Sequence, residues 1–426
     1  ERVDAVEGLT PAWLSAALWT VNAQAARPSE QLLPAGTRLM WKLVGPREVE
    51  QQFDATQVGK LINDPQMQAF VDEASEELNA GAAEFVNSGL SSQELINLAE
   101  TELSGAVVEM APREPARVLL AHLGKNRPQA DALLAQAYQR LATEGYRRTS
   151  EQLPTGDTAT VLRVAGQTPR QCVFVLKDDT LVIADNLQLA ADIAARFGAE
   201  DGGLAALPEY QDCRKRTLAG VDPAQPHLEA FIKPVEYILL TETLEPDEDP
   251  NETPFLHQHG FVAVQGIGLY AGLRKDPYDM VLRASIYAPG PYTGGMKMLK
   301  FVPGREYGPH AWIPDEVTSF ASVYWSVPDI FDNLHGVFDD LITDDTGGTF
   351  EEIIEDLKAP DGPAVDVREE LVMRMGPRIS VIGDALTPVT VVSERTIVAI
   401  EVKDEDEVAD AITAMFRDDP DVQRLR

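Results

Sequence analysis

The stretch Val118-Leu-Leu-Ala-His-Leu-Gly-Lys125-Asn126 is typical of a strand that leads directly into a capped helix. The same outline returns at a constant shift of 278 positions as Thr396-Ile-Val-Ala-Ile-Glu-Val-Lys403-Asp404. The apolar face of the following helix returns at that shift as well, because Ala130, Leu134, Ala137 and Tyr138 correspond to Val408, Ile412, Met415 and Phe416. Agreement of a strand and a helix face at one offset predicts an internal repeat.

The start of each of these helices carries the residue types of a capping box. Asn126 and Gln129 correspond to Asp404 and Glu407. In a capping box the N-cap side chain bonds a backbone amide three residues on, and the side chain at that position reaches back. We therefore expect both helices to begin in this way.

The chain upstream of each helix repeats less strictly, with a shift of 280 to 282 that indicates short insertions. The opening Leu33-Pro-Ala-Gly-Thr37, a strand to Val44 and a helix that begins at Pro46 are echoed by Ile313-Pro314, a strand to Trp325 and a helix from Pro328 through Leu341. The matching order of elements extends the predicted repeat over most of each unit.

The predicted fold class is α+β, with two related units whose largely antiparallel sheets are covered by helices, the second unit being incomplete. Alternating apolar residues predict further strands at 103–110, 116–123, 159–164, 171–176, 180–184 and 227–233, and a hairpin of 260–273 with 278–288. The predicted divisions are a docking helix at 1–32, repeat unit one at 33–235, a β-rich middle segment with an acidic loop at 236–310, and a partial repeat unit two at 311–426.

The second unit stops early relative to the first. Unit one places about ninety residues, from Ala142 to Lys233, after its capped helix, and unit two has no equivalent of them before Arg426. A half-built sheet would leave unpaired strand edges. We expect the natural chain to continue beyond Arg426, or a partner or the middle hairpin to complete the sheet.

The composition excludes two classes of partner. The 426 residues carry 69 acidic and 36 basic side chains, a formal charge of −33 that repels nucleic acid and anionic lipid. No apolar run approaches the roughly 20 residues of a transmembrane helix, so no membrane insertion is expected.

The two cysteines, Cys172 and Cys213, allow one disulfide or two free thiols, and their different surroundings favour free thiols.

Several segments resemble a family of uncharacterised, mostly exported bacterial proteins that is catalogued as a domain of unknown function. The matching segments are Leu33 to Thr37, Ala55 to Pro65 with Phe70, Asp178 to Ala184, Ala205 to Tyr210, and Ile313-Pro314 to Leu341. The resemblance covers most of the chain from Leu33 onward. It implies export to the periplasm or beyond and a repeated α+β architecture, and it implies no catalytic residue.

One short arrangement has the residue types of a metal site. His257-Gln258-His259 would point two imidazoles to the same side of a strand, and imidazole binds zinc or copper. His257 and His259 are therefore the candidate metal ligands, with solvent-facing imidazoles as the alternative. His122 corresponds to Ile400 in the repeat, which favours a packed histidine over a ligand. We expect no catalytic residue and no cofactor, because neither a nucleophile elbow nor a phosphate-binding loop is present.

These observations favour a periplasmic or extracellular protein that binds or holds another protein and has no catalytic site. The alternative is a hydrolase or metal-dependent enzyme of unfamiliar type, so the sequence leaves the question of enzymatic activity open. The expected partners are another protein or the rest of the protein's own longer chain. Nucleic acid is not an expected partner.

Overall fold

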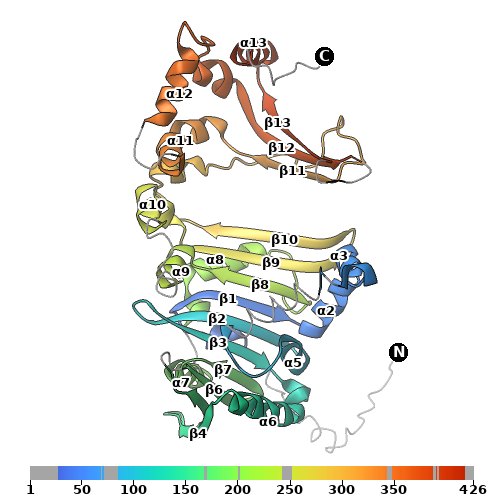
Figure 1. The fold of residues 1–426 in the computed structure, drawn as a ribbon, viewed down its shortest axis with the longest axis vertical. Coiled ribbons are helices and arrows are strands. Elements are labelled where there is room, and N and C mark those ends of the chain that lie inside the picture. The colour runs from blue at the N-terminus through green and yellow to red at the C-terminus, as the bar shows by residue number, and fades with distance from the viewer. Residues whose placement is uncertain are drawn as a thin grey trace, which may run out of the picture. The chain divides into compact units, whose positions relative to one another are not determined.

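The computed structural model describes residues 27–68, 70–71, 85–166, 170–199, 202–241, 252–342, 348–386, 390 and 393–417. Most of the docking helix predicted within residues 1–32 lies outside these ranges. The chain divides into two compact units, Glu1–Ile232 with Ile267–Ser285, and Lys233–Gly266 with Ile286–Arg426. Each unit has its own sheet, and we describe each by itself (Figure 1).

The first unit is built on a ten-stranded antiparallel sheet in the order β10-β9-β8-β1-β2-β3-β7-β6-β5-β4. Its strands are β1 (Thr37–Val44), β2 (Glu102–Ala111), β3 (Glu114–His122), β4 (Arg147–Gln152), β5 (Thr158–Val164), β6 (Arg170–Lys177), β7 (Thr180–Ala184), β8 (His227–Ile232), β9 (Gly266–Lys275) and β10 (Tyr278–Tyr287). Its helices are α1 (Ser29–Leu32), α2 (Pro46–Asp54), α3 (Gln57–Ile62), α5 (Ser92–Leu98), α6 (Arg127–Thr143), α7 (Leu187–Arg196) and α8 (Pro208–Thr217).

Local sequence explains the central strands. All five residues of β7 are buried, as expected for an apolar run in the middle of a sheet. The turn between β6 and β7 places Asp178 and Asp179 at φ values of 46° and 59°, a left-handed conformation that aspartate tolerates and that two-residue hairpin turns require. Gly45, at φ 62°, separates β1 from the helix that begins at Pro46.

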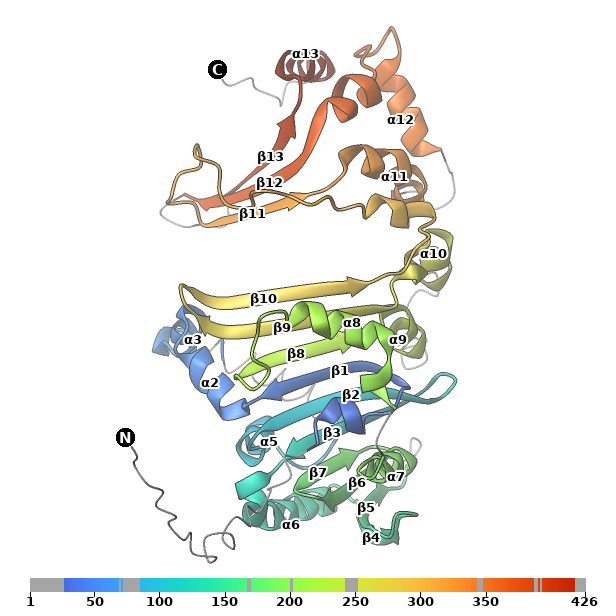
Figure 2. The same ribbon diagram turned by 180° about the vertical axis from the view of Figure 1, so that it is seen from behind.

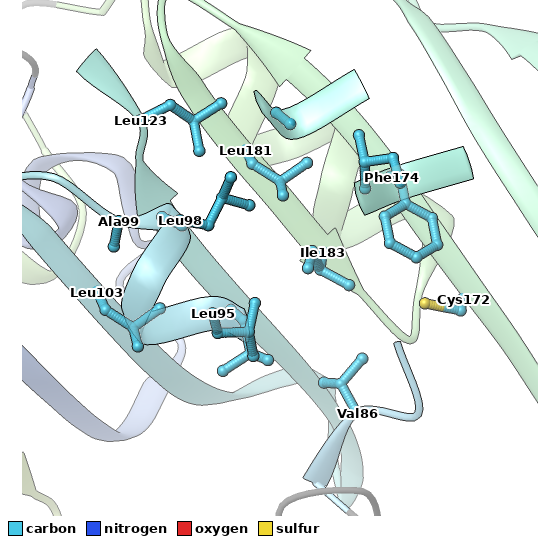
Figure 3. Close-up of a cluster of buried hydrophobic side chains, with 14 of the residues drawn as sticks. Val86, Leu95, Leu98, Ala99, Leu103, Leu123, Cys172, Phe174, Leu181 and Ile183 are labelled. Carbon is cyan, nitrogen blue, oxygen red and sulfur yellow. The ribbon is translucent and has the colours of Figure 1, made fainter. Parts of the chain in front are cut away.

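One face of the sheet carries the apolar core of the first unit. Helices α5 and α6 pack on this face, and the close-up shows the buried side chains they cover (Figure 3). The cluster includes Leu95 and Leu98 of α5, Leu134 and Leu141 of α6, and strand residues such as Ile183.

The opposite face lies under α1 and α8. Figure 2 shows α8 in front of β8 and β9, and a side chain at Gly268 of β9 would meet Cβ of Cys213 of α8 at 2.7 Å. Because successive residues of a strand point to opposite faces, Lys42 of β1 and Glu229 of β8 lie on this side. This face combines apolar packing with a group of buried charged residues.

The second unit has a three-stranded antiparallel sheet in the order β11-β12-β13. Its strands are β11 (Ser319–Tyr324), β12 (Met375–Ala385) and β13 (Glu394–Val402), and its helices are α9 (Pro234–Thr241), α10 (Glu252–Gln258), α11 (Val327–Ile342), α12 (Thr349–Lys358) and α13 (Glu405–Met415). A small core joins Val408 and Ala411 of α13 to Val365 and Leu371.

The order of the main elements is the same in the two units. In each, a strand is followed by a helix with proline in its first turn and, after further short helices, by a hairpin and a helix: β1, α2, β2, β3 and α6 in the first, and β11, α11, β12, β13 and α13 in the second. The three strands are neighbours in the same order in both sheets. In the second unit no strand corresponding to β7 lies beside β13 among the described residues, so the α+β fold with an incomplete second unit is confirmed.

Two details differ from the expectations. Asn126 makes no capping bond, because its Nδ2 donates to the carbonyl oxygens of Leu98 at 3.2 Å and Asn97 at 3.4 Å. The expected capping box there is wrong, whereas the side chain of Asp404 does accept from the amide of Glu407. The second difference concerns the middle segment at 236–310, which is divided between the units, since β9 and β10 extend the ten-stranded sheet.

Candidate functional site

A buried ionic cluster lies on the α1 and α8 side of the first sheet. Lys42, only 2% exposed, is at its centre. Its Nζ lies 2.9 Å from Oε2 of Glu30, 3.4 Å from Oε1 of Glu229 and 3.7 Å from Oε2 of Glu102. All three carboxylates belong to buried residues, so Lys42 is surrounded by negative charge in the interior.

The sheet and two helices bring these groups together. Lys42 of β1 lies opposite Glu229 of β8, and Glu102 begins the neighbouring strand β2. Glu30 comes from the short helix α1, whose first residue, Ser29, donates its backbone amide to Oε1 of Glu102 at 2.9 Å. The cluster therefore fastens α1 to three strands of the sheet.

Two further side chains, Arg214 and His227, complete the cluster. Arg214 of α8 places Nε 3.1 Å from Oε2 of Glu229 and Nη2 3.7 Å from Oε1 of Glu30. His227 is fully buried, with Nδ1 2.5 Å from the carbonyl oxygen of Gln225 and Nε2 2.8 Å from Oε1 of Glu229. Each ring nitrogen of His227 therefore lies within hydrogen-bond distance of an oxygen atom.

The charged members of the cluster are paired with one another. Lys42 and Arg214 face the carboxylates of Glu30, Glu102 and Glu229, and the imidazole of His227 lies against Glu229. Buried charges are tolerated when they are paired and hydrogen-bonded. This pairing explains how so many ionic groups lie inside a folded unit.

The pKa values of two members shift in the directions that this pairing requires. Burial alone would raise the pKa of Glu229, but the hydrogen bond from His227 and the charges of Lys42 and Arg214 lower it to about 2. Burial likewise opposes the charged form of Lys42, and the carboxylates of Glu30, Glu102 and Glu229 outweigh it and raise the pKa of Lys42. Both groups are held in their ionised forms.

A surface hollow of about 460 Å³ adjoins the cluster, and Glu30, Tyr210, Gln211, Arg214 and Lys215 are among its lining residues. The hydroxyl of Tyr210 is buried and has no hydrogen-bond partner among the described residues. Burial and the nearby charge of Glu30 raise the pKa of Tyr210 well above its usual value. Glu30 and Arg214, which line the hollow, are ion-paired within the cluster, so the arrangement favours a structural cross-link over a catalytic pair.

The sequence analysis did not single out this cluster. The available signal was a charged residue inside an otherwise apolar strand, as for Lys42 between Trp41 and Leu43, and for Glu229 between Leu228 and Ala230. Such residues are almost never fully buried unless they are paired. Sequence alone does not show that the two strands are neighbours.

The candidate metal ligands lie at the end of a helix rather than on a strand. His257 is exposed in the last turn of α10, whereas His259, beyond its end, is 4% exposed. Nε2 of His259 lies 2.6 Å from Oδ2 of Asp340, which also accepts a hydrogen bond from Gln258 at 2.8 Å. Across the described ranges, no three His, Cys, Asp or Glu side chains are placed to hold a metal ion.

The other residues singled out from the sequence are buried. Neither Cys172 nor Cys213 forms a disulfide, as the sequence favoured. His122 is packed in the first sheet, and its Nε2 has no hydrogen-bond partner within the described part of the chain. Burial lowers the pKa of His122 despite the nearby carboxylates of Glu102 and Glu30.

A second candidate region is the edge of the three-stranded sheet. We call it the β13 surface and define it by the free edge of β13 and by the exposed apolar side chains of β12 and β13: Val381, Ile397, Val398, Ile400 and Val402. Val398 is 60% exposed and Ile397 56% exposed. Their counterparts on β3, Leu120 and Leu119, are 1% and 6% exposed.

The difference in exposure between β13 and β3 has a physical cause. In the first unit β7 pairs with the outer edge of β3, and α6 packs over the same sheet. Among the described residues of the second unit, nothing pairs with the outer edge of β13. The same kind of strand is thus interior in one unit and open in the other.

No family model, curated protein or solved structure matches this chain. Within the described residues, no helix combines the length and apolar character needed to cross a bilayer.

Proposed function

We propose that this protein is an extracytoplasmic binding or structural-interaction protein that recognises another polypeptide through the β13 surface. One observation carries the proposal: every residue of β13 except Ala399 is exposed, whereas Val118 to His122 of its counterpart β3 are buried by a neighbouring strand and a helix. Unpaired strand edges with apolar side chains are templates for strand addition.

Two further features support this function. The resemblance to a family of mostly exported proteins supports a location outside the cytoplasm. The ionic cluster around Lys42 bonds its own members, which is consistent with a rigid scaffold. The first unit would then be the support, and the second unit the part that binds.

Site-specific photo-crosslinking in the producing cells tests the proposal. A photoreactive amino acid replaces Val398 on β13 in one variant and Asp131, exposed on α6, in a control variant. We expect a discrete crosslinked adduct from position 398 and none from position 131, because only the first position lies on the β13 surface.

The mass of the adduct identifies the bound molecule. An adduct with any protein that forms at position 398 alone supports the proposed function. Adducts of equal yield from both positions, or no adduct at position 398, would contradict it.

A further inference from the structure

Hairpin–helix segments already join edge to edge within the first unit. β2, β3 and α6 form one such segment, and β6, β7 and α7 form another. Their closing strands, β3 and β7, pair antiparallel through their outer edges. β12, β13 and α13 form a third segment of the same kind, with no strand on the outer edge of β13 in the part of the chain that the structure describes.

We infer that a second copy of this chain occupies the β13 surface, with the β13 strands of the two copies paired antiparallel across a twofold axis. This inference rests on the proposed function and names its partner. The two three-stranded sheets would join into one sheet of six strands. A self-complementary edge of this kind closes on itself and produces a dimer rather than a fibre.

The pairing within the first unit fixes the expected register. Ala121 of β3 and Leu181 of β7 lie opposite each other. Each stands five positions before the N-cap of the helix that follows, Asn126 for α6 and Asn186 for α7. The equivalent residue of β13 is Ala399, five positions before Asp404. Ala399 is therefore expected opposite Ala399 of the second copy.

The neighbouring pairs are apolar in this register. Leu120 faces Val182 in the first unit, and the equivalent pair across the twofold axis is Val398 with Ile400. Both residues are exposed in the single chain, at 60% and 38%, and the pairing would remove them from water.

Charge opposes the association. Each copy has a formal charge of −33, so two copies repel one another. In the proposed register, Arg395 also falls opposite Lys403 of the second copy, a pair of like charges near the ends of the strands. Added salt screens both effects, and we therefore expect the dimer to strengthen as the salt concentration rises.

Sedimentation velocity of the purified chain over a range of protein concentrations tests the inference. We expect a monomer–dimer equilibrium that shifts toward dimer between about 0.1 and about 0.5 M NaCl. Val398→Lys places a charge in the apolar pair and should weaken dimerisation by at least about tenfold. The control is Leu282→Lys, at a 67% exposed position of β10, which should leave dimerisation unchanged.

Symmetry gives a second readout that does not depend on a loss of binding. Ala399→Cys would bring two thiols together across the axis, within the 4.4 to 6.8 Å Cα separation of a disulfide, and should form a covalent dimer on mild oxidation. Thr396→Cys is the control, because two copies of residue 396 would be about 20 Å apart along the strands. The native Cys172 and Cys213 are buried and should not interfere.

The outcomes separate this inference from the proposed function. A chain that is monomeric at every concentration and salt level, or a disulfide that forms at position 396 and not at 399, would overturn the inference. If photo-crosslinking at position 398 then captured a different protein, the proposed function would stand without the dimer. The absence of any adduct at position 398 would contradict both the dimer and the proposed function.

Discussion

At the scale of single residues, the structure depends most on Lys42. Its ammonium group lies among three buried carboxylates, whereas Arg214 contacts only Glu30 and Glu229 among them in the described part of the chain. Removing one partner of a buried ionic network leaves uncompensated charge, which costs far more than the net value of the network itself. The cluster therefore makes folding sensitive to this one side chain.

We predict that Lys42→Met lowers the free energy of unfolding by about 3 to 5 kcal/mol. The matched control is Lys125→Met, which removes a lysine whose ion pair with Glu100 is mostly exposed, and should cost less than about 1 kcal/mol. Urea unfolding of the three proteins at neutral pH measures both effects. Equal losses for the two variants would show that the cluster is not the centre of stability.

Asp185 should make the free energy of unfolding fall as the pH rises, which is the opposite of the usual dependence for a carboxylate. Burial raises the pKa of Asp185 to about 6 despite a 2.8 Å hydrogen bond from the backbone amide of Arg117. The folded protein thus keeps this proton at pH values where the unfolded chain, with the ordinary value of 3.8, has lost it. The contribution of Asp185 to stability is fully present below about pH 4 and is lost as the pH rises through about 6.

Asp185→Asn should remove this dependence. As the pH rises from about 4 to about 6, the free energy of unfolding of the unsubstituted protein should decline relative to that of Asp185→Asn. The reason is that only the unsubstituted protein has a carboxyl group at this position that can lose a proton. Urea unfolding of both proteins across that range measures the difference. A difference that stays constant, or that grows with pH, would contradict the shifted pKa.

At the scale of elements, helices α6 and α13 look alike in sequence at their first residues but begin differently. Asn126 uses its amide nitrogen as a donor to two carbonyl oxygens, whereas Asp404 uses its carboxylate as an acceptor for a helix amide. An aspartate would suit the second role and not the first. The two helix starts look the same in sequence because asparagine and aspartate are both common N-cap residues with side chains of similar shape.

We predict that Asn126→Asp costs about 1 to 3 kcal/mol, because it replaces a buried donor with a charge that faces carbonyl oxygens. The reciprocal change Asp404→Asn should cost less than about 0.5 kcal/mol, since asparagine caps a helix nearly as well. Thermal or urea unfolding of the two variants measures the difference. A larger loss for Asp404→Asn would reverse the assigned roles.

The helix faces also differ between the units. Leu134 of α6 is 6% exposed, but Ile412, its counterpart on α13, is 44% exposed, and Val408 and Ala411 are buried instead. We expect Leu134→Ala to cost about 2 to 4 kcal/mol and Ile412→Ala less than about 1 kcal/mol. Denaturant melts measure both changes, and equal losses would mean that Ile412 is part of a core.

The sequence predicted elements well where the pattern was strong. The strand at 37–44, the hairpin of β2 and β3, the three strands before α7 and the strand–helix pair at β13 and α13 are confirmed. The polar strand β4 was missed because its residues are mostly exposed and lack alternation. The ionic cluster was missed because it depends on which strands are neighbours. The helical setting of His257 was missed because a pair of histidines separated by one residue can occur in a helix as well as in a strand.

At the scale of the whole molecule, the closing strands of the two units, β3 and β13, lie in different surroundings. The same closing strand is interior in the first unit, where β7 continues the sheet, and open in the second. A high negative charge keeps such molecules apart and in solution, which limits uncontrolled pairing of open edges. Binding at β13 would then depend on both concentration and salt.

Amide hydrogen exchange at residue resolution tests the central claim most directly. In dilute purified protein, the alternate amides of β13 at 396–402 that point away from β12 should exchange at least about a hundredfold faster than the amides of β3, because an open edge lacks a neighbouring strand. At high protein concentration and salt, these outward-pointing β13 amides should become protected while those of β3 stay unchanged. Protection of β13 equal to that of β3 in dilute protein would contradict an open, partner-binding edge.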